Sequence, residues 1–130
     1  MLSDHIRFWH DAERIQVPSR PWELIQIGNA GPPLETEAGW LVVTHGVGPM
    51  RQYALGAVLL DIDDPSRVIG HLRDPILVPN EEERDGYVPN VVYSCGSIIH
   101  NNRLMIAYGA SDTASNFATV PVDALLAELT

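Results

Sequence analysis

The apolar positions of the chain fall into short runs separated by Gly, Pro and Asn, and two of these runs echo one another. Residues 39–46 form an apolar β-run that ends in a histidine held between tight-turn residues. Residues 103–109 repeat this pattern at a constant offset of 63 positions. Residues 56–61 recur loosely at 118–123, shifted by 62 positions. A match that holds its register over two successive strands indicates two copies of one supersecondary unit.

The same patterning predicts the individual strands. Residues 22–27 alternate apolar and polar at their start, which favours a strand. Residues 40–45 and 53–61 are almost continuously apolar, as expected of strands covered on both faces. Asn101-Asn102 lies between two apolar runs and has the composition of a hairpin turn with positive φ.

A helix is predicted at the C-terminal end. Pro121 suits the beginning of a helix. The apolar residues that follow fall on one face at helical spacing; they are Val122, Leu125, Leu126 and Leu129.

The sequence therefore predicts an all-β fold of antiparallel strands with a short C-terminal helix. Roughly four strands in each 63-residue repeat fit a propeller blade better than a sandwich. We interpret residues 1–130 as a single partial β-propeller domain with meander blades. Its parts are a weakly specified segment at 1–21, a first blade unit at 22–75, a second at 76–121 and the helix at 122–130. About two blades do not close a ring.

Composition narrows the classes of partner and compartment. The net charge is −9, from 17 acidic against 8 basic residues, which argues against nucleic acid or an anionic membrane as the main partner. The single cysteine, Cys95, permits no internal disulfide, and its apolar surroundings predict a buried packing residue. No signal pattern follows Met1, and no apolar run reaches the roughly 18 residues of a membrane span. We therefore expect a soluble, cytoplasmic protein.

Other polar clusters have ordinary structural interpretations. Asp61, Asp63 and Asp64 lack the spacing of a calcium loop and are expected to cap a turn. The scattered histidines lack the spacing of a zinc site, so no metal is predicted. The acidic run at 81–83 is expected to be a solvated loop.

Several motifs, in the same order along the chain, resemble those of a known family. Residues 27–41 resemble a Gly-Pro-Pro…Thr-x-x-Gly-Trp-Leu motif, and residues 44–47 resemble Tyr-His-Gly-Val. Residues 53–61, followed by Pro65, resemble Tyr-x-Leu-Gly-Ala-x-Leu-Leu-Asp…Pro, and residues 88–92 and 108–113 match further motifs. From Trp22 onward the chain is similar to the C-terminal part of glycoside hydrolase family 130, the β-1,4-mannosyl phosphorylases and related β-mannosidases.

The resemblance implies a fold and a reaction. The family fold is a five-bladed β-propeller with its active site in the central funnel, in chains more than twice this length. The general acid is an aspartate in the N-terminal half, and we find no counterpart of that segment here. Inorganic phosphate is the co-substrate implied, with no other cofactor. We therefore predict no catalytic residue in this chain.

The resemblance also implies candidate binding residues, each with a structural alternative. His45 matches a histidine that contacts phosphate; alternatively it is a strand-end histidine satisfied by a local carbonyl. Asp112 matches an aspartate that binds sugar hydroxyls in the glycone subsite; alternatively it caps a turn. Tyr108 is a possible second sugar contact or an ordinary strand tyrosine. Thr36 belongs to a loop that either shapes the funnel rim or is only a loop.

Two functional hypotheses follow. In the first, the chain is the C-terminal part of a mannoside phosphorylase-like glycosidase, which retains some sugar- and phosphate-binding surface but is inactive alone. In the second, it is a non-catalytic module that binds carbohydrate or assembles with itself. A partial propeller exposes strand edges and core faces. We therefore expect a homo-oligomer, or a complementing propeller half, as partner beside a mannoside or other small carbohydrate.

Overall fold

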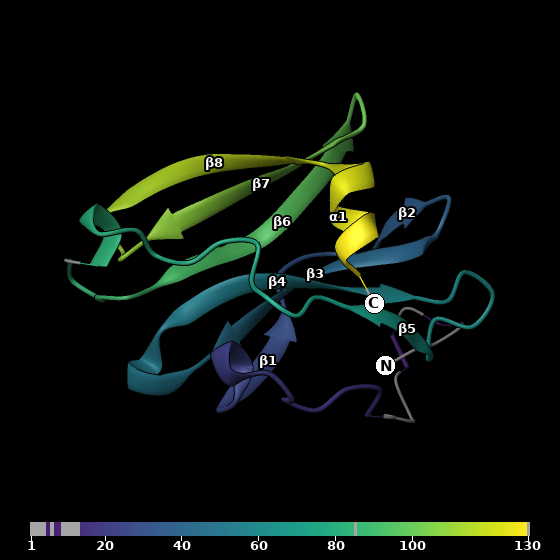
Figure 1. Ribbon diagram of the computed structural model, residues 1–130, viewed down its shortest axis with the longest axis horizontal. Helices are drawn as coiled ribbons and strands as arrows, with labels where there is room; N and C mark the ends of the chain where they lie inside the picture. The colour runs from purple at the N-terminus through teal and green to yellow at the C-terminus, as the bar shows by residue number, and fades with distance from the viewer. Residues whose placement is uncertain (1–4, 6, 9–13, 85, 130) are drawn as a thin grey trace.

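Two antiparallel sheets and one short helix make up the fold (Figure 1). The structure is a computed structural model and describes residues 5, 7–8, 14–84 and 86–129. The first sheet contains β1 (Gln26–Asn29), β2 (Leu34–Thr36), β3 (Gly39–Val47), β4 (Tyr53–Leu60) and β5 (Val68–His71). The second contains β6 (Val92–His100), β7 (Arg103–Ala110) and β8 (Ala114–Pro121). The helical elements are η1 (Pro21–Glu23), η2 (Pro49–Arg51), η3 (Glu82–Arg84) and α1 (Val122–Glu128).

Strand β3 is the centre of the first sheet. Along one edge it pairs with β1 and β2 in turn, and along the other it pairs with β4, which pairs with β5. The second sheet is a simple meander in the order β6-β7-β8. Consecutive antiparallel pairing with short turns is what the Gly, Pro and Asn punctuation predicts.

The echo in the sequence coincides with two hairpins, β3–β4 and β7–β8. Leu41 pairs with Leu59, and Leu104 pairs with Val120. Leu104 lies 63 positions after Leu41, whereas Val120 lies 61 positions after Leu59. The second part of the sequence echo has an offset of 62, so the β7–β8 hairpin is one residue shorter than the echo predicts. The division of the chain into blade units at 22–75 and 76–121 stays a prediction.

The main core lies between the two sheets. Alternate residues of β3 and β4, such as Leu41, Val43 and Leu55, pack against Leu104 and Ile106 of β7. Helix α1 closes one end of this core with its buried face; Val122, Leu125 and Leu129 belong to the same cluster. The helix face predicted from the spacing is therefore confirmed.

The opposite face of the first sheet is also apolar. Val42, Val58 and Leu60 form a second cluster, and each is at most 6% exposed. Since both sets of alternating side chains on β3 and β4 are buried, the interpretation of these runs as strands covered on both faces is confirmed.

Two expectations are wrong. Residues 22–27 are not one strand: Pro21 begins the 3₁₀ turn η1, the Glu23 carboxylate accepts hydrogen bonds from the backbone N–H groups of Ser19 and Arg20, and β1 begins only at Gln26. Cys95 is exposed rather than buried. The pairing of β6 with β7 shifts register between Tyr93 and Gly96, which places Cys95 in the irregular part of the strand.

Local turn predictions are confirmed. Asn101 and Asn102 have φ of 49° and 56° and connect β6 to β7. The Asp61 carboxylate accepts hydrogen bonds from the N–H groups of Asp63 and Asp64, which lowers its pKa, with the bond from Asp64 the largest cause.

The architecture is therefore all-β with antiparallel sheets and one short C-terminal helix, as predicted. In the described part of the chain, no helix has the length and apolar character needed to cross a membrane.

Candidate functional site

Most of the candidate residues, but not Thr36, lie near the place where the second sheet begins against β4. The Tyr53 N–H donates to the Asn90 carbonyl at 2.9 Å, and Tyr53 and Val91 form a parallel bridge. This junction places the start of β6 beside the end of β3 and the beginning of β4.

His45 lies at this junction, half-buried on the face of β3 that looks toward the second sheet. Its ring centroid is 6.4 Å from that of Tyr53, in a stacked arrangement, and 6.0 Å from that of Tyr93. A Cβ added to its cross-strand partner Gly28 would lie 2.6 Å from Cε1 of His45, so the ring packs directly over a position that only glycine fits.

The hydrogen bond of His45 fixes its chemistry. Nδ1 lies 3.2 Å from the Asn29 carbonyl oxygen. A carbonyl only accepts, so this bond requires a proton on Nδ1, and in the neutral ring Nε2 is then an acceptor. The His45 ring therefore has a local carbonyl as a hydrogen-bond partner, as its structural interpretation predicts. Nε2 donates to an anion only when the imidazole is protonated.

A shallow depression of about 560 Å³ adjoins this junction on the second sheet. Its lining includes Tyr93 and Phe117, whose side chains are exposed, together with Tyr108, Asp112 and Asn116. Tyr93 therefore touches the His45 ring and lines the same depression as Asp112. Aromatic surfaces beside a carboxylate suit a ligand that has both apolar faces and hydroxyl groups.

Asp112 lies in the turn between β7 and β8. Ser111 and Asp112 have φ of 48° and 57°, and the Thr113 N–H donates to the Ala110 carbonyl at 3.0 Å. Asp112 is exposed, and within the described residues its carboxylate has no hydrogen bond. The predicted alternative, capping of Thr113 or Ala114 by Asp112, is therefore not what the turn uses.

Tyr108 lines the depression but its hydroxyl is already engaged. It donates to Glu83 Oε1 at 2.9 Å. Burial, the hydrogen bond to Glu83 and the negative charge of that carboxylate raise the pKa of Tyr108 above its ordinary value. A sugar that contacts Tyr108 therefore meets an aromatic ring whose hydroxyl proton already forms a hydrogen bond to Glu83.

Thr36 lies apart from these residues, at the end of β2 and next to the turn into β3. Its hydroxyl donates to the Gly39 carbonyl at 2.7 Å and accepts from the Ala38 N–H at 3.3 Å. Both bonds close the hairpin, and Thr36 is absent from the lining of the depression. Its role in binding stays a prediction.

Glu83 was not singled out by its sequence context, and for this residue the expectation of a solvated loop is wrong. It is partly buried, and its Oε1 accepts from both Tyr108 and Asn116 Nδ2, the latter at 3.2 Å. Its backbone N–H donates to Asn80 Oδ1 at 2.8 Å, while the Asn80 N–H donates to Glu83 Oε2 at 3.1 Å. The spacing Asn-x-x-Glu is the sequence signal of such a capping box.

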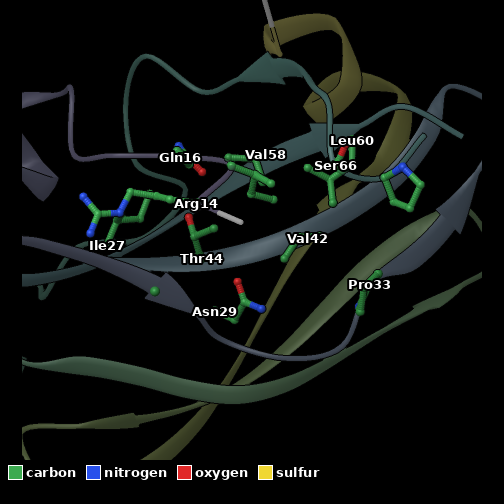
Figure 2. Close-up of a pocket in the computed structure, with 13 residues that line it drawn as sticks. Arg14, Gln16, Ile27, Asn29, Pro33, Val42, Thr44, Val58, Leu60 and Ser66 are labelled. Atoms are coloured by element: carbon green, nitrogen blue, oxygen red, sulfur yellow. The ribbon is translucent and has the colours of Figure 1, made fainter. Parts of the chain in front are cut away.

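A second hollow, of about 490 Å³, lies on the other face of the first sheet (Figure 2). Its floor is formed by Val42, Thr44 and Val58, and residues 14–16 line another side. Thr44 is 2% exposed, and its hydroxyl has no hydrogen-bond partner in the described structure. This hollow faces away from His45 and Asp112, and no sequence motif predicted it.

Comparison with known proteins agrees with the motifs. The profile of the family described as β-1,4-mannooligosaccharide phosphorylase matches residues 3–130. The chain is 41% identical over 119 residues to a 1,2-β-oligomannan phosphorylase of Thermoanaerobacter sp. (strain X514), covering 90% of this chain and 40% of that protein. It is 47% identical over 103 residues to a β-1,2-mannobiose phosphorylase of the same organism, covering 78% of this chain and 34% of that protein.

The fold is similar to a solved structure from the same group. The β-1,2-mannobiose phosphorylase of Listeria innocua, in complex with β-1,2-mannobiose, superposes with a TM-score of 0.80 and 32% identity, over 87% of this chain and 32% of that one. The chain thus spans two fifths or less of the relatives it matches. The chain belongs to glycoside hydrolase family 130, whose profile is that of β-1,4-mannooligosaccharide phosphorylase.

Proposed function

We propose that the chain carries the glycone-binding part of a mannoside phosphorylase site, centred on Asp112. The observation that carries this proposal is the exposed carboxylate of Asp112, without a hydrogen bond in the described structure, beside aromatic side chains in one depression. A carboxylate accepts from two neighbouring sugar hydroxyls, and an aromatic face packs against the C–H groups of a pyranose. Relatives that act on mannooligosaccharides support a mannoside as the ligand.

His45 is the proposed phosphate contact. Because Nδ1 is held by the Asn29 carbonyl, the imidazole contacts phosphate through Nε2 and in its protonated form. Its proximity to Tyr93, which also lines the depression, supports a phosphate position adjoining the sugar.

We propose that the depression holds only part of the active site. Cleavage of a glycosidic bond needs a proton donor near the leaving oxygen. Among the described residues that line the depression, Asp112 is the sole carboxylate, and in this proposal it binds the sugar. In this proposal the general acid comes from another part of the protein, as the family resemblance implies.

The test is phosphorolysis of β-1,2- and β-1,4-mannobiose by the 130-residue chain, measured as mannose 1-phosphate released. We expect no turnover above a protein-free control. Sustained release of mannose 1-phosphate by this chain alone would refute the assignment of the acid to another part of the protein.

A second candidate function, assembly, is favoured by a separate observation. The apolar hollow on the outer face of the first sheet is lined along one side by residues 14–16. It contains the buried hydroxyl of Thr44, which has no hydrogen-bond partner among the described residues. A face of this kind gains from being covered by another sheet, from a second copy or a complementing half of the propeller. Light scattering at micromolar concentration is expected to give a mass above that of the monomer; a stable monomer would count against self-association.

A further inference from the structure

We propose that Glu83 is the positioning residue for Asp112: it holds the turn at residues 110–113 so that the Asp112 carboxylate stays unpaired at the depression. This inference rests on the proposed function, because it assigns a further residue to the same mannoside site. It also changes the role of the acidic run at 81–83, whose third residue connects two adjacent strands of the second sheet, β7 and β8.

The carboxylate of Glu83 makes the first connection. Oε1 accepts from the Tyr108 hydroxyl on β7 at 2.9 Å and from Asn116 Nδ2 on β8 at 3.2 Å. Tyr108 and Asn116 are directly paired across the two strands that the turn connects. One carboxylate oxygen thus ties both strands together close to the turn.

The backbone of the same segment makes the second connection. The Ser111 hydroxyl donates to the Glu83 carbonyl, and Ser111 is fully buried. Gly86 lies so close that an added Cβ would be 2.7 Å from the Ser111 carbonyl oxygen and 3.1 Å from Thr113 Cγ2. The segment around Glu83 is therefore packed directly against the turn.

The turn needs such support because its backbone is unfavourable for these residues. Ser111 and Asp112 both adopt left-handed conformations, with φ of 48° and 57°. For residues other than glycine this region is costly, though Asp tolerates it better than most. Contacts from outside the turn offset that cost. None of them uses the Asp112 side chain, which leaves its carboxylate for a ligand.

Local capping alone does not account for these contacts. The reciprocal bonds between Asn80 and Glu83 already fix the start of η3. Those bonds use Oε2 and the backbone N–H of Glu83. The bonds from Oε1 and the carbonyl reach residues 25 to 33 positions away and add nothing to the cap.

The experiment compares Glu83→Ala and Glu83→Gln with the matched control Glu81→Gln, an exposed neighbour in the same loop. Two readouts are used: the amide resonances of residues 111–113 in the unliganded chain, and the Kd for β-1,2-mannobiose by calorimetry. The binding measurement is repeated in the Asp112→Asn background. If Glu83→Ala does not fold, Glu83→Gln and Tyr108→Phe supply the same comparison.

We expect Glu83→Ala to shift the amide resonances of residues 111–113 and to weaken mannobiose binding by about tenfold, the equivalent of about one lost hydrogen bond to a charged group. Glu83→Gln retains an acceptor for Tyr108 and is expected to lose less. In the Asp112→Asn background the additional loss should fall to less than about twofold, because Glu83 acts through Asp112.

Unchanged resonances at 111–113 in Glu83→Ala would overturn the inference whether or not the chain binds a sugar. An equal loss of binding with and without the Asp112 carboxylate would also overturn it, since Glu83 would then act independently. If the wild-type chain binds no mannobiose, the proposed function fails, and the resonances alone still decide whether Glu83 holds the turn.

Discussion

At the scale of single residues, the side chains at the depression are of two kinds. Some hold the structure together, whereas Asp112 is available to bind a ligand. The Tyr108 hydroxyl donates a hydrogen bond to the Glu83 carboxylate, and the Ser111 hydroxyl donates one to the Glu83 carbonyl. Asp112, next in the chain, is exposed and has no such partner in the described structure. A buried polar group is costly to leave unpaired, whereas an exposed carboxylate is solvated until a ligand replaces the water.

The raised pKa of Tyr108 predicts a specific alkaline instability. Because its folded-state pKa lies above the unfolded value, Tyr108 contributes stability that is fully present below about pH 10 and is lost as the pH rises through the folded-state pKa. All 8 basic residues of the Lys and Arg class are arginines, so no lysine titrates in this range. Urea unfolding across alkaline pH should show the free energy of unfolding falling.

Tyr108→Phe is the control for this prediction, since it keeps the ring and removes the titrating hydroxyl. We expect a shallower fall in this variant than in the wild type. The account of Tyr108 is contradicted if both proteins lose stability with the same slope above about pH 10.

At the scale of elements, close packing on the outer face of the first sheet depends on two glycines. An added Cβ at Gly46 would lie 2.5 Å from Trp22 Cε3, and one at Gly56 would lie 2.3 Å from Trp22 Cη2. The indole also donates from Nε1 to the Arg73 carbonyl at 3.1 Å, which restricts its movement. The turn at η1 is thereby fixed onto β3 and β4.

Gly56→Ala is therefore expected to destabilise the fold. The added methyl group meets a large ring that a hydrogen bond holds in place, and overpacking of this kind costs about 1–3 kcal/mol in the free energy of unfolding. Gly96→Ala is the matched strand control, since an added Cβ there has nothing within 4 Å. Urea unfolding of the two variants measures the difference, and equal stability would show that Trp22 moves aside freely.

The elements that the sequence predicted correctly are those set by local rules. The Asn101-Asn102 hairpin follows from residues that tolerate positive φ, and the buried face of α1 follows from the spacing of its leucines. The start of the first sheet was missed because Pro21 and the Glu23 carboxylate together stabilise a 3₁₀ turn where alternation suggested a strand.

The candidate site was less predictable because it depends on contacts between distant residues. Motif resemblance identified Asp112 and His45 but said nothing of the hydrogen bonds from Glu83 to Tyr108 and Asn116. Cys95 is exposed in phase with Tyr93, while the alternating residues Val92 and Ser94 are buried, and the apolar composition of this run did not indicate which residues face the core. The spacing of Asn80 and Glu83 is typical of a capping box, and this local signal predicts that Glu83 is held in place rather than solvated.

At the scale of the whole molecule, the chain matches about a third of the length of a solved family member. Its two sheets share one core with α1, and they superpose on a mannobiose phosphorylase over about a third of that structure. The inner face of the first sheet meets the second sheet, while the outer face holds the hollow of Figure 2. The outer face is therefore the surface on which the proposed assembly would form.

The most direct test of the central claim is calorimetric titration of the 130-residue chain with β-1,2-mannobiose, for the wild type and Asp112→Ala. The account predicts saturable binding by the wild type and at least a tenfold higher Kd for Asp112→Ala, about 1.4 kcal/mol or more, with both proteins folded at the titration temperature. Equal binding by the two proteins, or no binding by the folded wild type, would contradict it.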